Sequence, residues 1–389
     1  MQRTGDRARI AFFDAYALDA GSGIALRDLI AGSDRNRLDA LAVLPRPGPL
    51  VEMLRAIDCP VHVVEPPPPL RAYGGRLVDA GWREKLEVAG TLARYSWTLA
   101  RWLLAERVDL LHCNQTRAVF EAGPAGRLAG VPVVWNVRIR EHLPRSVVRL
   151  CEECSELIIP LTDRDFAGLP DEQHLLSRAT VIGNAVDTER FSPSRDHAAP
   201  RQTLGVGDGP LLLSAGVLVP RKGFDVAIRA MAQVVCVHPD ATLLIAGGDS
   251  DTPGGCRAAL EALVGELGLG ERVAFLGHRD DMPELLAACD VFVLASHLEG
   301  DPAVVLEAMA TGRPVIAAEP AASAVQDGLT GFVVPDRDAD ALARAILRLL
   351  DEPALARRMG ESARSVAVAR HDIRAMVRRY EAAWESLLA

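Results

Sequence analysis

Short apolar runs alternate along the chain with longer stretches in which apolar residues recur at helical spacing. The first series of short runs comprises Ile10 to Phe13, Ala40 to Leu44, Val61 to Val64, Leu110 to His112, Val131 to Trp135, Leu157 to Pro160 and Thr180 to Ile182. The second series comprises Leu211 to Ala215, Thr242 to Ala246, Val273 to Leu276, Val291 to Ala295, Val315 to Ala318 and Phe332 to Val334. Strand-sized runs that alternate with helical patterns are typical of βαβ units around a parallel sheet. The pattern predicts an α/β protein with two doubly wound, Rossmann-like domains.

A segment with little apolar periodicity, Ser192 to Pro210, separates the two series and is rich in Pro, Gly, Asp and Arg. This composition predicts a linker, so we expect one domain over residues 1–195 and another over residues 196–371. In doubly wound sheets the binding loops follow the carboxyl ends of the strands. The two domains are therefore expected to face each other across a ligand-binding cleft.

The last segment, residues 372–389, carries an apolar stripe at helical spacing. The stripe consists of Ile373, Met376, Val377, Tyr380, Ala383, Trp384 and Leu387. The charges between them are mixed: Arg374, Arg378 and Arg379 are balanced by Asp372, Glu381 and Glu385. A helix that lies on a membrane surface needs a basic polar face, so this helix is expected to pack against the protein instead.

Composition excludes several classes of protein. With 389 residues, 49% of them hydrophobic and no apolar run longer than a strand, the chain is neither disordered nor membrane-spanning. The polar start, Met1 to Arg9, has no apolar core typical of a secretory signal, which predicts a cytoplasmic protein. The net charge of −9 argues against nucleic acid as a partner.

The numbers of cysteines and lysines indicate which kinds of site the chain can contain. Seven cysteines, an odd number in a long chain, fit buried thiols better than disulfides. The one close pair, Cys151 and Cys154, lacks the second pair that a four-sulfur zinc site needs. Only two lysines occur, Lys85 and Lys222, so each is a rare choice that can indicate function.

The first of three glycine-containing loops follows the first predicted strand. Its sequence, Asp19 to Leu26, contains Gly21, Ser22 and Gly23 and opens a predicted helix, where backbone amides can bind an anion. Leu26 stands where the third glycine of a dinucleotide fingerprint belongs, which disfavours a dehydrogenase. A plain tight turn is an equally good interpretation.

The second loop runs from Ala215 to Phe224, after the first strand of the second domain. Arg221 and Lys222 lie there between Gly216 and Gly223. Two cations at the start of a helix can neutralise a pyrophosphate, and the position agrees with the rule that ligands bind beyond the carboxyl ends of strands. The alternative is a solvated turn.

The third run spans Ser296 to Ile316 and combines two carboxylates with a helix start. Pro302 suits the first helical position and Asp301 its cap, so Glu299 precedes the helix and Glu307 lies inside it. A half-buried Glu307 needs a donor, and ribose hydroxyls would serve. A structural salt bridge is the alternative.

These segments carry a family resemblance. The motifs are Glu299-Gly-x-Pro, Leu306-Glu-Ala-Met-Ala, Gly312-x-Pro-Val-Ile, Asp327-Gly-x-x-Gly-Phe-Val-Val-Pro, Lys222-Gly223, the segment Val181 to Pro193 and the segment Phe275 to Leu286. Together they resemble retaining glycosyltransferase family 4. The resemblance is specific over residues 180–350 and implies the GT-B fold, in which the terminal helix crosses back to the N-terminal domain.

The resemblance implies a role for each matching position. Lys222 and Arg221 would stabilise the donor diphosphate, and Glu307 would bind the ribose. Glu299 would contact the transferred sugar and phosphate. The other donor contacts would be Gly216, Gly277, His278, Arg279, Gly300, Asp301, Pro302 and Ala303. From the N-terminal, acceptor-binding domain, the Gly21, Ser22 and Gly23 loop would approach the phosphate, and Asn114 and Arg138 would lie near the acceptor. The acceptor would bind near three segments of that domain: Asp14 to Gly23, Asn114 to Arg117 and Arg138 to His142.

Three departures from the family pattern qualify these roles. Val217 stands where an arginine is usual, and Arg221 is a candidate to supply the missing charge. The family's Gly-Gly-x-x-Glu segment is replaced by Glu319 to Ser323. The histidine that many relatives place after the strand near Trp135 is absent, while Arg138 keeps a cation there. Front-face displacement, in which the leaving phosphate takes the acceptor proton, needs no protein base.

The expected function is transfer of a hexose or amino-hexose, with retention, from a nucleoside diphosphate sugar to a hydroxylated acceptor. A UDP-sugar is favoured over a GDP-sugar, and no metal or other cofactor is expected. The reaction would serve the glycosylation of natural products or of the cell envelope. No basic amphipathic patch is evident, so a soluble acceptor is favoured, with peripheral membrane contact left open, in a monomer or homodimer. The alternatives are a nucleotide-sugar epimerase or hydrolase on the same fold, and a degenerate nucleotide-binding scaffold.

Overall fold

The computed structural model describes residues 7–17, 21–71, 81–138, 143–169, 171–193, 198–249 and 256–389. Its contacts divide the chain into two units: unit 1 contains Met1–Gly183 and Ile373–Ala389, and unit 2 contains Asn184–Asp372. The division precedes the linker expected from the sequence. The reason is that the chain after Gly183 bonds to the end of unit 2: the Val186 amide donates to the His371 carbonyl at 2.9 Å.

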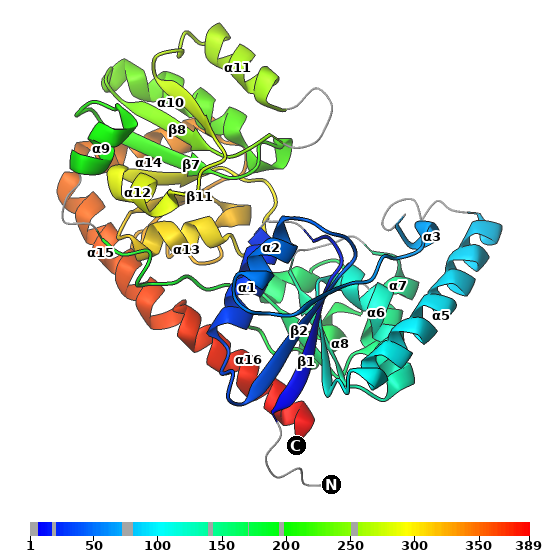
Figure 1. Cartoon of the computed structure of the whole chain (residues 1–389). Coiled ribbons are helices and arrows are strands. Elements are labelled where there is room, and N and C mark those ends of the chain that lie inside the picture. Colours follow the sequence, from blue (N-terminus) through cyan, green and yellow to red (C-terminus); the bar gives the residue numbers. More distant parts are fainter. Residues whose placement is uncertain are drawn as a thin grey trace. The chain divides into compact units, whose positions relative to one another are not determined.

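Unit 1 is built on a six-stranded parallel sheet in the order β3-β2-β1-β4-β5-β6 (Figure 1). The strands are β1 (Ala8–Asp14), β2 (Leu38–Leu44), β3 (Val61–Val63), β4 (Leu110–Asn114), β5 (Val133–Val137) and β6 (Leu157–Pro160). The helices are α1 (Gly21–Gly32), α2 (Pro49–Arg55), α3 (Pro68–Arg71), α5 (Trp82–Ala105), α6 (Thr116–Ala129), α7 (Arg145–Cys154), η1 (Asp163–Phe166), α8 (Glu172–Ser177) and α16 (Ile373–Leu388).

Alternate residues of the unit 1 strands face two helical layers, because successive side chains of a strand point to opposite faces. Phe13 packs in the core that α5, α6 and α7 cover, together with Tyr95 and Val119. Phe12 points to the other face, where its ring contacts Trp384 of α16 at 5.5 Å between centroids. Both faces are apolar, which explains why the predicted strands are continuous apolar runs.

Unit 2 repeats the same topology, with the strand order β12-β11-β10-β7-β8-β9. The strands are β7 (Leu211–Ala215), β8 (Thr242–Ala246), β9 (Val273–Gly277), β10 (Val291–Leu294), β11 (Val315–Ala318) and β12 (Gly331–Val334). The helices are α9 (Ala198–Leu204), η2 (Pro220–Lys222), α10 (Phe224–Val237), α11 (Cys256–Glu266), α12 (Met282–Ala288), α13 (Ala303–Ala310), η3 (Glu319–Ala321), α14 (Ala339–Asp351) and α15 (Pro353–Arg370).

Two apolar cores lie on the two faces of the unit 2 sheet. One contains Met231 of α10 and Ile346 of α14. The other contains Leu286 of α12, Met309 of α13 and Ala363 of α15. Both sheets therefore have the doubly wound, Rossmann-like architecture predicted from the sequence, and this prediction is confirmed.

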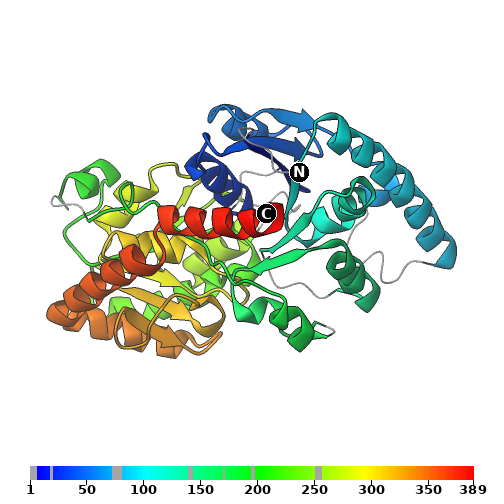
Figure 2. The same ribbon diagram turned by 90° about the horizontal axis from the view of Figure 1, so that it is seen from below.

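The terminal helix α16 belongs to unit 1, as the sequence predicted (Figure 2). Its buried residues are Met376, Val377, Tyr380 and Trp384. Trp384 donates from Nε1 to Nδ1 of His112 in β4 at 3.3 Å. At Gly32 of α1 a β-carbon would lie 2.9 Å from a methyl group of Val377, so a glycine is needed where α16 approaches α1.

One predicted strand is wrong. Thr180 to Ile182 forms no strand, and the neighbouring Ala179 makes a single bridge to Ile158 of β6. The amides of Thr180 and Ile182 do donate to β6. However, the carbonyl of Val181 accepts from the guanidinium of Arg379, so a side chain and not a further strand bonds to this segment.

Candidate functional site

Predicted donor residues of unit 2 meet at the switch point of its sheet, where the strand order reverses. Strands β7 and β10 are neighbours, and from them the strand order runs outward to β9 on one side and to β12 on the other. Ligands of doubly wound sheets bind beyond the carboxyl ends of the strands at such a point. Lys222 follows β7 and Glu299 follows β10, so the topology brings together two residues 77 positions apart.

Lys222 and Glu299 form an ion pair with 2.5 Å between Nζ and Oε1. Both side chains are largely covered, with 12% and 10% of their surface exposed. Arg221 adds a second cation, 3.7 Å from the other oxygen of Glu299, and donates to the carbonyl of Leu298 at 3.2 Å. One carboxylate thus holds two cations together, a charge arrangement that suits a polyanionic ligand.

Glycines let the loops of unit 2 cross closely at this edge. Gly223 adopts a φ of 64°, and a β-carbon there would lie 2.0 Å from the carbonyl oxygen of Ala295. Gly216 has a φ of 148°. A β-carbon on Gly247 would lie 1.8 Å from the carbonyl oxygen of Gly216. A side chain at either contact would push apart the loops that carry Lys222 and Glu299.

Helix α13 begins at Ala303 and places its amino-terminal end next to Glu299. The sequence assigned the cap to Asp301, and this assignment is wrong: Pro302 occupies the cap position and no side chain caps the helix. The Asp301 carboxylate instead accepts from the Asn184 amide at 2.7 Å and from the Ser323 hydroxyl at 2.7 Å. Segment 319–323, which differs from the family pattern, therefore holds the start of α13 through Ser323. Glu307 lies one turn further along this helix.

The residues predicted to border the nucleotide base lie two strands away, at the end of β9. Gly277 closes this strand with a φ of 70°. His278 is exposed, and Arg279 forms a two-pronged ion pair with Asp281. The ends of β7, β8 and β9 are linked by backbone bonds: Leu218 donates to Gly248, and Gly247 donates to Gly277. The predicted donor residues therefore line one continuous edge.

A further pair at this edge was not predicted. His297, which follows β10, lies 2.6 Å through Nδ1 from the carboxylate of Asp336, which follows β12. The amide of His297 donates to the carbonyl of Arg221 at 2.7 Å. The ion pair and this backbone bond therefore tie the loop that carries Glu299 to the loops that follow β12 and β7. The only sequence signal for this pair was a histidine two positions before Glu299.

The carboxyl edge of unit 1 carries a buried polar cluster at its own switch point, between β1 and β4. Asp14 accepts from Nδ2 of Asn114 at 2.8 Å and from Nε2 of Gln115 at 3.2 Å. Gln115 also donates to the hydroxyl of Ser22 at 2.9 Å. Burial raises the pKa of Asp14, and bonds from the Ala17 and Tyr16 amides oppose this rise.

The structure corrects the predicted glycine loop of unit 1. Gly21, Ser22 and Gly23 form the first turn of α1, so they lie in a helix and not in a loop. The preceding part of the predicted loop, residues 18–20, lies outside the described residues, as do residues 139–142 of the predicted acceptor segment. Gln115 lies in the predicted acceptor segment Asn114 to Arg117, and its φ of 106° is rare for a residue with a side chain.

Arg138 at the end of β5 is linked to the terminal helix. The hydroxyl of Tyr380 accepts hydrogen bonds from the Asn136 amide group and from Arg138. Arg138 also lies close enough to Asp14 to lower the pKa of that carboxyl, and it lowers that of His112. Burial is the larger cause for His112, whose pKa falls to about 3, so this imidazole is neutral.

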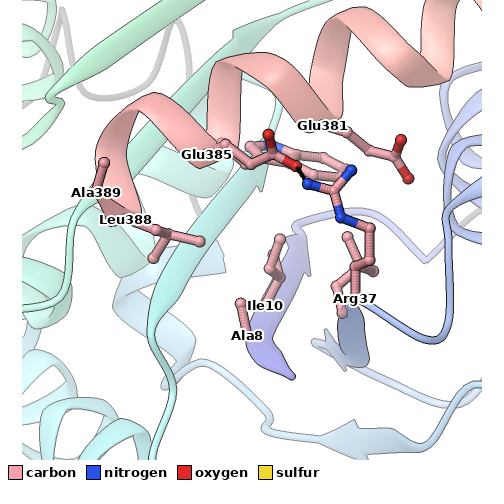
Figure 3. Close-up of a pocket in the computed structure, with 9 residues that line it drawn as sticks. Ala8, Ile10, Arg37, Glu381, Glu385, Leu388 and Ala389 are labelled. Carbon is pink, nitrogen blue, oxygen red and sulfur yellow. Dashed lines mark hydrogen bonds and ion pairs between the residues drawn. The ribbon is translucent and has the colours of Figure 1, made fainter. Parts of the chain in front are cut away.

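A hollow of about 270 Å³ lies at the opposite edge of unit 1 (Figure 3). It is lined by Ala8 and Leu38 at the starts of β1 and β2 and by the end of α16. Arg37 forms an ion pair with Glu385 across it, as Figure 3 shows. Since binding loops follow the carboxyl ends of strands, this hollow is not the candidate site.

The described residues show neither a metal-binding cluster nor a membrane-spanning helix. Within the residues that the structure describes, no cluster of three or more His, Cys, Asp and Glu is arranged to hold a metal ion. None of the helices in the described ranges is both long and apolar enough to cross a bilayer. All seven cysteines are free thiols, five of them buried.

Comparison with known proteins connects these features to a family. The family model of glycosyl transferases group 1 matches residues 197–366, and the glycosyl transferase 4-like domain matches residues 20–182. The solved structure of Anabaena HepE in complex with UDP covers 97% of this chain and is itself fully covered, with a TM-score of 0.81 and 25% identity.

Two curated relatives match over shorter stretches. The D-inositol 3-phosphate glycosyltransferase of Streptomyces scabiei is 31% identical over 283 residues, which are 67% of this chain and 60% of that protein. The GDP-mannose-dependent alpha-(1-6)-phosphatidylinositol monomannoside mannosyltransferase of Mycolicibacterium smegmatis is 37% identical over 195 residues, 47% of this chain and 50% of that protein. The chain therefore spans about half to three fifths of the length of these relatives.

The two family models together account for most of the chain, and each falls on one of the two Rossmann-like units. The similarity to HepE extends over both units. The chain belongs to the glycosyl transferases group 1 family, which is glycosyltransferase family 4, and has the GT-B fold.

Proposed function

We propose that the chain transfers a hexosyl group from a nucleoside diphosphate sugar to an acceptor hydroxyl, with retention of configuration and without a metal. The observation that carries this proposal is the covered ion pair of Lys222 and Glu299 at the switch point of unit 2, with Arg221 beside it. Family membership supports the reaction class.

The ion pair indicates how a donor would be held. When a diphosphate arrives, Lys222 exchanges its carboxylate partner for phosphate oxygens, and Glu299 becomes available to accept hydrogen bonds from sugar hydroxyls. The amino-terminal end of α13 adds its partial positive charge, since the first amides of a helix lack partners within it. Arg221 supplies the charge that Val217 cannot, and Glu307 accepts from the ribose.

Chemistry then proceeds at the anomeric carbon of the sugar. The bond from this carbon to the phosphate oxygen breaks, and the acceptor oxygen bonds to the same face of the carbon. The acceptor proton passes to the leaving phosphate, so the products are a nucleoside diphosphate and a glycoside. Lys222 and Arg221 stabilise the charge that develops on the departing diphosphate, the task a divalent metal performs in other transferases.

UDP is the donor nucleotide we favour. The similar structure of HepE was solved with UDP, whereas the mycobacterial relative is described as GDP-mannose-dependent. In this chain the base would lie along His278 and Arg279, beyond β9. A hydroxylated small molecule or glycan would be the acceptor, held by unit 1 near Asn114 and Arg138.

A binding screen tests the proposal. Unfolding of the full chain is followed with UDP, GDP, ADP or dTDP and their sugars, in EDTA and then with Mg²⁺. A bound nucleotide raises the free energy of unfolding by about 2.7 kcal/mol at a hundredfold excess over its dissociation constant. We expect UDP to do so equally in EDTA and Mg²⁺, and Glu307→Ala to abolish the effect while the exposed Glu361→Ala on α15 does not.

Product analysis then separates the alternatives. Transfer predicts a glycoside of retained configuration that forms only with an acceptor. A changed sugar or free sugar released at the same rate without acceptor would indicate an epimerase or hydrolase. Folded protein that binds none of the nucleotides at millimolar concentration would contradict the proposal and favour a degenerate scaffold.

A further inference from the structure

Helix α5 of unit 1 exposes large apolar side chains along one row. Trp82 and Trp97 are 69% and 61% exposed, and Leu86 and Leu104 are exposed to a similar degree. These positions are 4, 11 and 7 residues apart, all close to whole numbers of helical turns, so they share one face. Burial of the other face, which includes Tyr95, explains why the helix forms. It does not explain why this row is apolar.

A second row, of arginines, runs beside the first. Arg83, Arg94 and Arg101 repeat at the same helical spacing and are exposed. None of the three forms an ion pair with a carboxylate of the described residues. Some exposed arginines of other helices do have such partners: Arg149 pairs with Glu153, and Arg257 with Glu261.

The two rows form one amphipathic surface, which we define as the α5 patch: Trp82, Arg83, Leu86, Arg94, Trp97, Arg101 and Leu104. Arg83 lies over the ring of Trp82, with 5.3 Å from its guanidinium carbon to the ring centroid. Figure 1 shows α5 along the outside of unit 1, with the rest of that unit on one side of it only. A continuous row of exposed tryptophan and leucine is uncommon on a monomer surface.

We propose that the α5 patch docks on an anionic lipid bilayer. Tryptophan and leucine insert at the boundary between headgroups and acyl chains, and arginines that face outward bind lipid phosphates. Each basic residue adds attraction to an anionic surface, and this is strongest where no carboxylate neutralises it. The local charge matters because the whole chain, at −9, would otherwise be repelled by such a membrane.

A second copy of the chain is the competing occupant. Two α5 patches that face each other would bring the unpaired arginine rows of both copies close together, with only Glu84 and Glu87 on α5 to offset them. Charge complementarity therefore favours an anionic surface over self-association. The expectation that the chain lacks a basic amphipathic patch does not hold for α5.

Vesicle sedimentation of the full chain tests the proposal. We expect binding to phosphatidylcholine vesicles that contain phosphatidylglycerol, little binding to phosphatidylcholine alone, and weakening by salt. The pair Leu86→Ser with Trp97→Ser, and separately the pair Arg94→Gln with Arg101→Gln, should each lower partitioning by about tenfold or more. Leu128→Ser, at a 58% exposed leucine of α6, and Arg149→Gln are the matched controls and should bind as the unaltered chain does.

Fluorescence of the unaltered chain gives a readout that does not depend on a variant folding. Trp82 and Trp97 are exposed, while Trp135 and Trp384 are fully buried. Brominated lipid in the anionic vesicles should therefore quench part of the emission. No binding to anionic vesicles, an equal loss in the Leu128→Ser control, or a dimer that Trp97→Ser abolishes would each overturn the proposal. The assay contains no nucleotide, so its failure leaves the proposed transferase reaction untouched.

Discussion

At the scale of single residues, the ion pair of Lys222 and Glu299 explains why a lysine-poor chain keeps a lysine in this loop. The pair is largely covered, so each charge depends on the other for compensation. A ligand that displaces Glu299 must itself be an anion. In the proposed reaction, the pair keeps both charges compensated until a phosphate arrives.

The first prediction concerns Lys222→Ala. Turnover should fall by about 10²-fold or more, since removal of one preorganised group that stabilises transition-state charge typically costs this much. The measurement is kcat at saturating donor. Arg229→Ala, at an exposed cation of the neighbouring α10, is the control and should leave kcat unchanged. Unaltered turnover in Lys222→Ala would remove this residue from the mechanism.

A buried carboxyl of unit 1 gives a prediction about pH. Glu121 in α6 is fully covered, and Arg117 donates to one of its oxygens at 2.7 Å. Burial raises the pKa of Glu121 to about 7, in spite of Arg117. The folded chain therefore keeps a proton that the unfolded chain releases above about pH 4.5, and stability falls as pH rises from there to about pH 7.

Glu121→Gln removes this titration. Relative to the unaltered chain, the free energy of unfolding of the variant should rise by on the order of 3 kcal/mol between about pH 5 and about pH 7, and then stay level. The changed bond from Arg117 to residue 121 adds an offset that does not depend on pH. Urea unfolding across this range measures the difference, with the exposed Glu153→Gln as control. A difference that is constant with pH would contradict the prediction.

At the scale of elements, α16 shows how the chain's end supports unit 1. Trp384 fills the space between α16 and the sheet, in contact with Phe12 and His112. Trp384→Ala should lower the free energy of unfolding by about 3–5 kcal/mol, the usual cost of an emptied core site. Denaturant unfolding compares it with Trp97→Ala, whose exposed side chain should cost little. Equal losses in both variants would show that α16 does not stabilise unit 1.

The elements also show what the sequence could predict. Strands such as Leu157–Pro160 and Thr242–Ala246 were found at their observed bounds, because strands buried on both faces read as continuous apolar runs. The predicted cap at Asp301 failed because its partners, Asn184 and Ser323, lie 117 and 22 positions away. The α5 patch escaped notice because periodicity alone does not tell which row of a helix stays uncovered.

At the scale of the whole molecule, the same topology occurs twice with different chemistry at its switch point. Unit 2 presents two cations, the exposed Arg221 and the largely covered Lys222, whereas unit 1 presents the buried polar cluster around Asp14. A nucleoside diphosphate needs the former, and a hydroxylated acceptor suits the latter. Sequence motifs predicted the candidate site residues of unit 2, whereas Tyr380 joined the unit 1 cluster only through the fold, because it lies 244 positions from its partner Asn136.

This contrast predicts where UDP alone acts. A bound ligand raises the free energy of local opening, so amide hydrogen exchange should slow in residues 216–223, 277–279 and 297–303 of unit 2. Residues 114–117 of unit 1 should exchange at an unchanged rate until an acceptor is added. Glu307→Ala, which would remove the proposed ribose contact, should reduce the protection in unit 2. Both units have a switch point of the kind that binds such ligands. Slowed exchange of residues 114–117 with UDP alone would therefore indicate that the nucleotide binds unit 1, and would contradict the prediction.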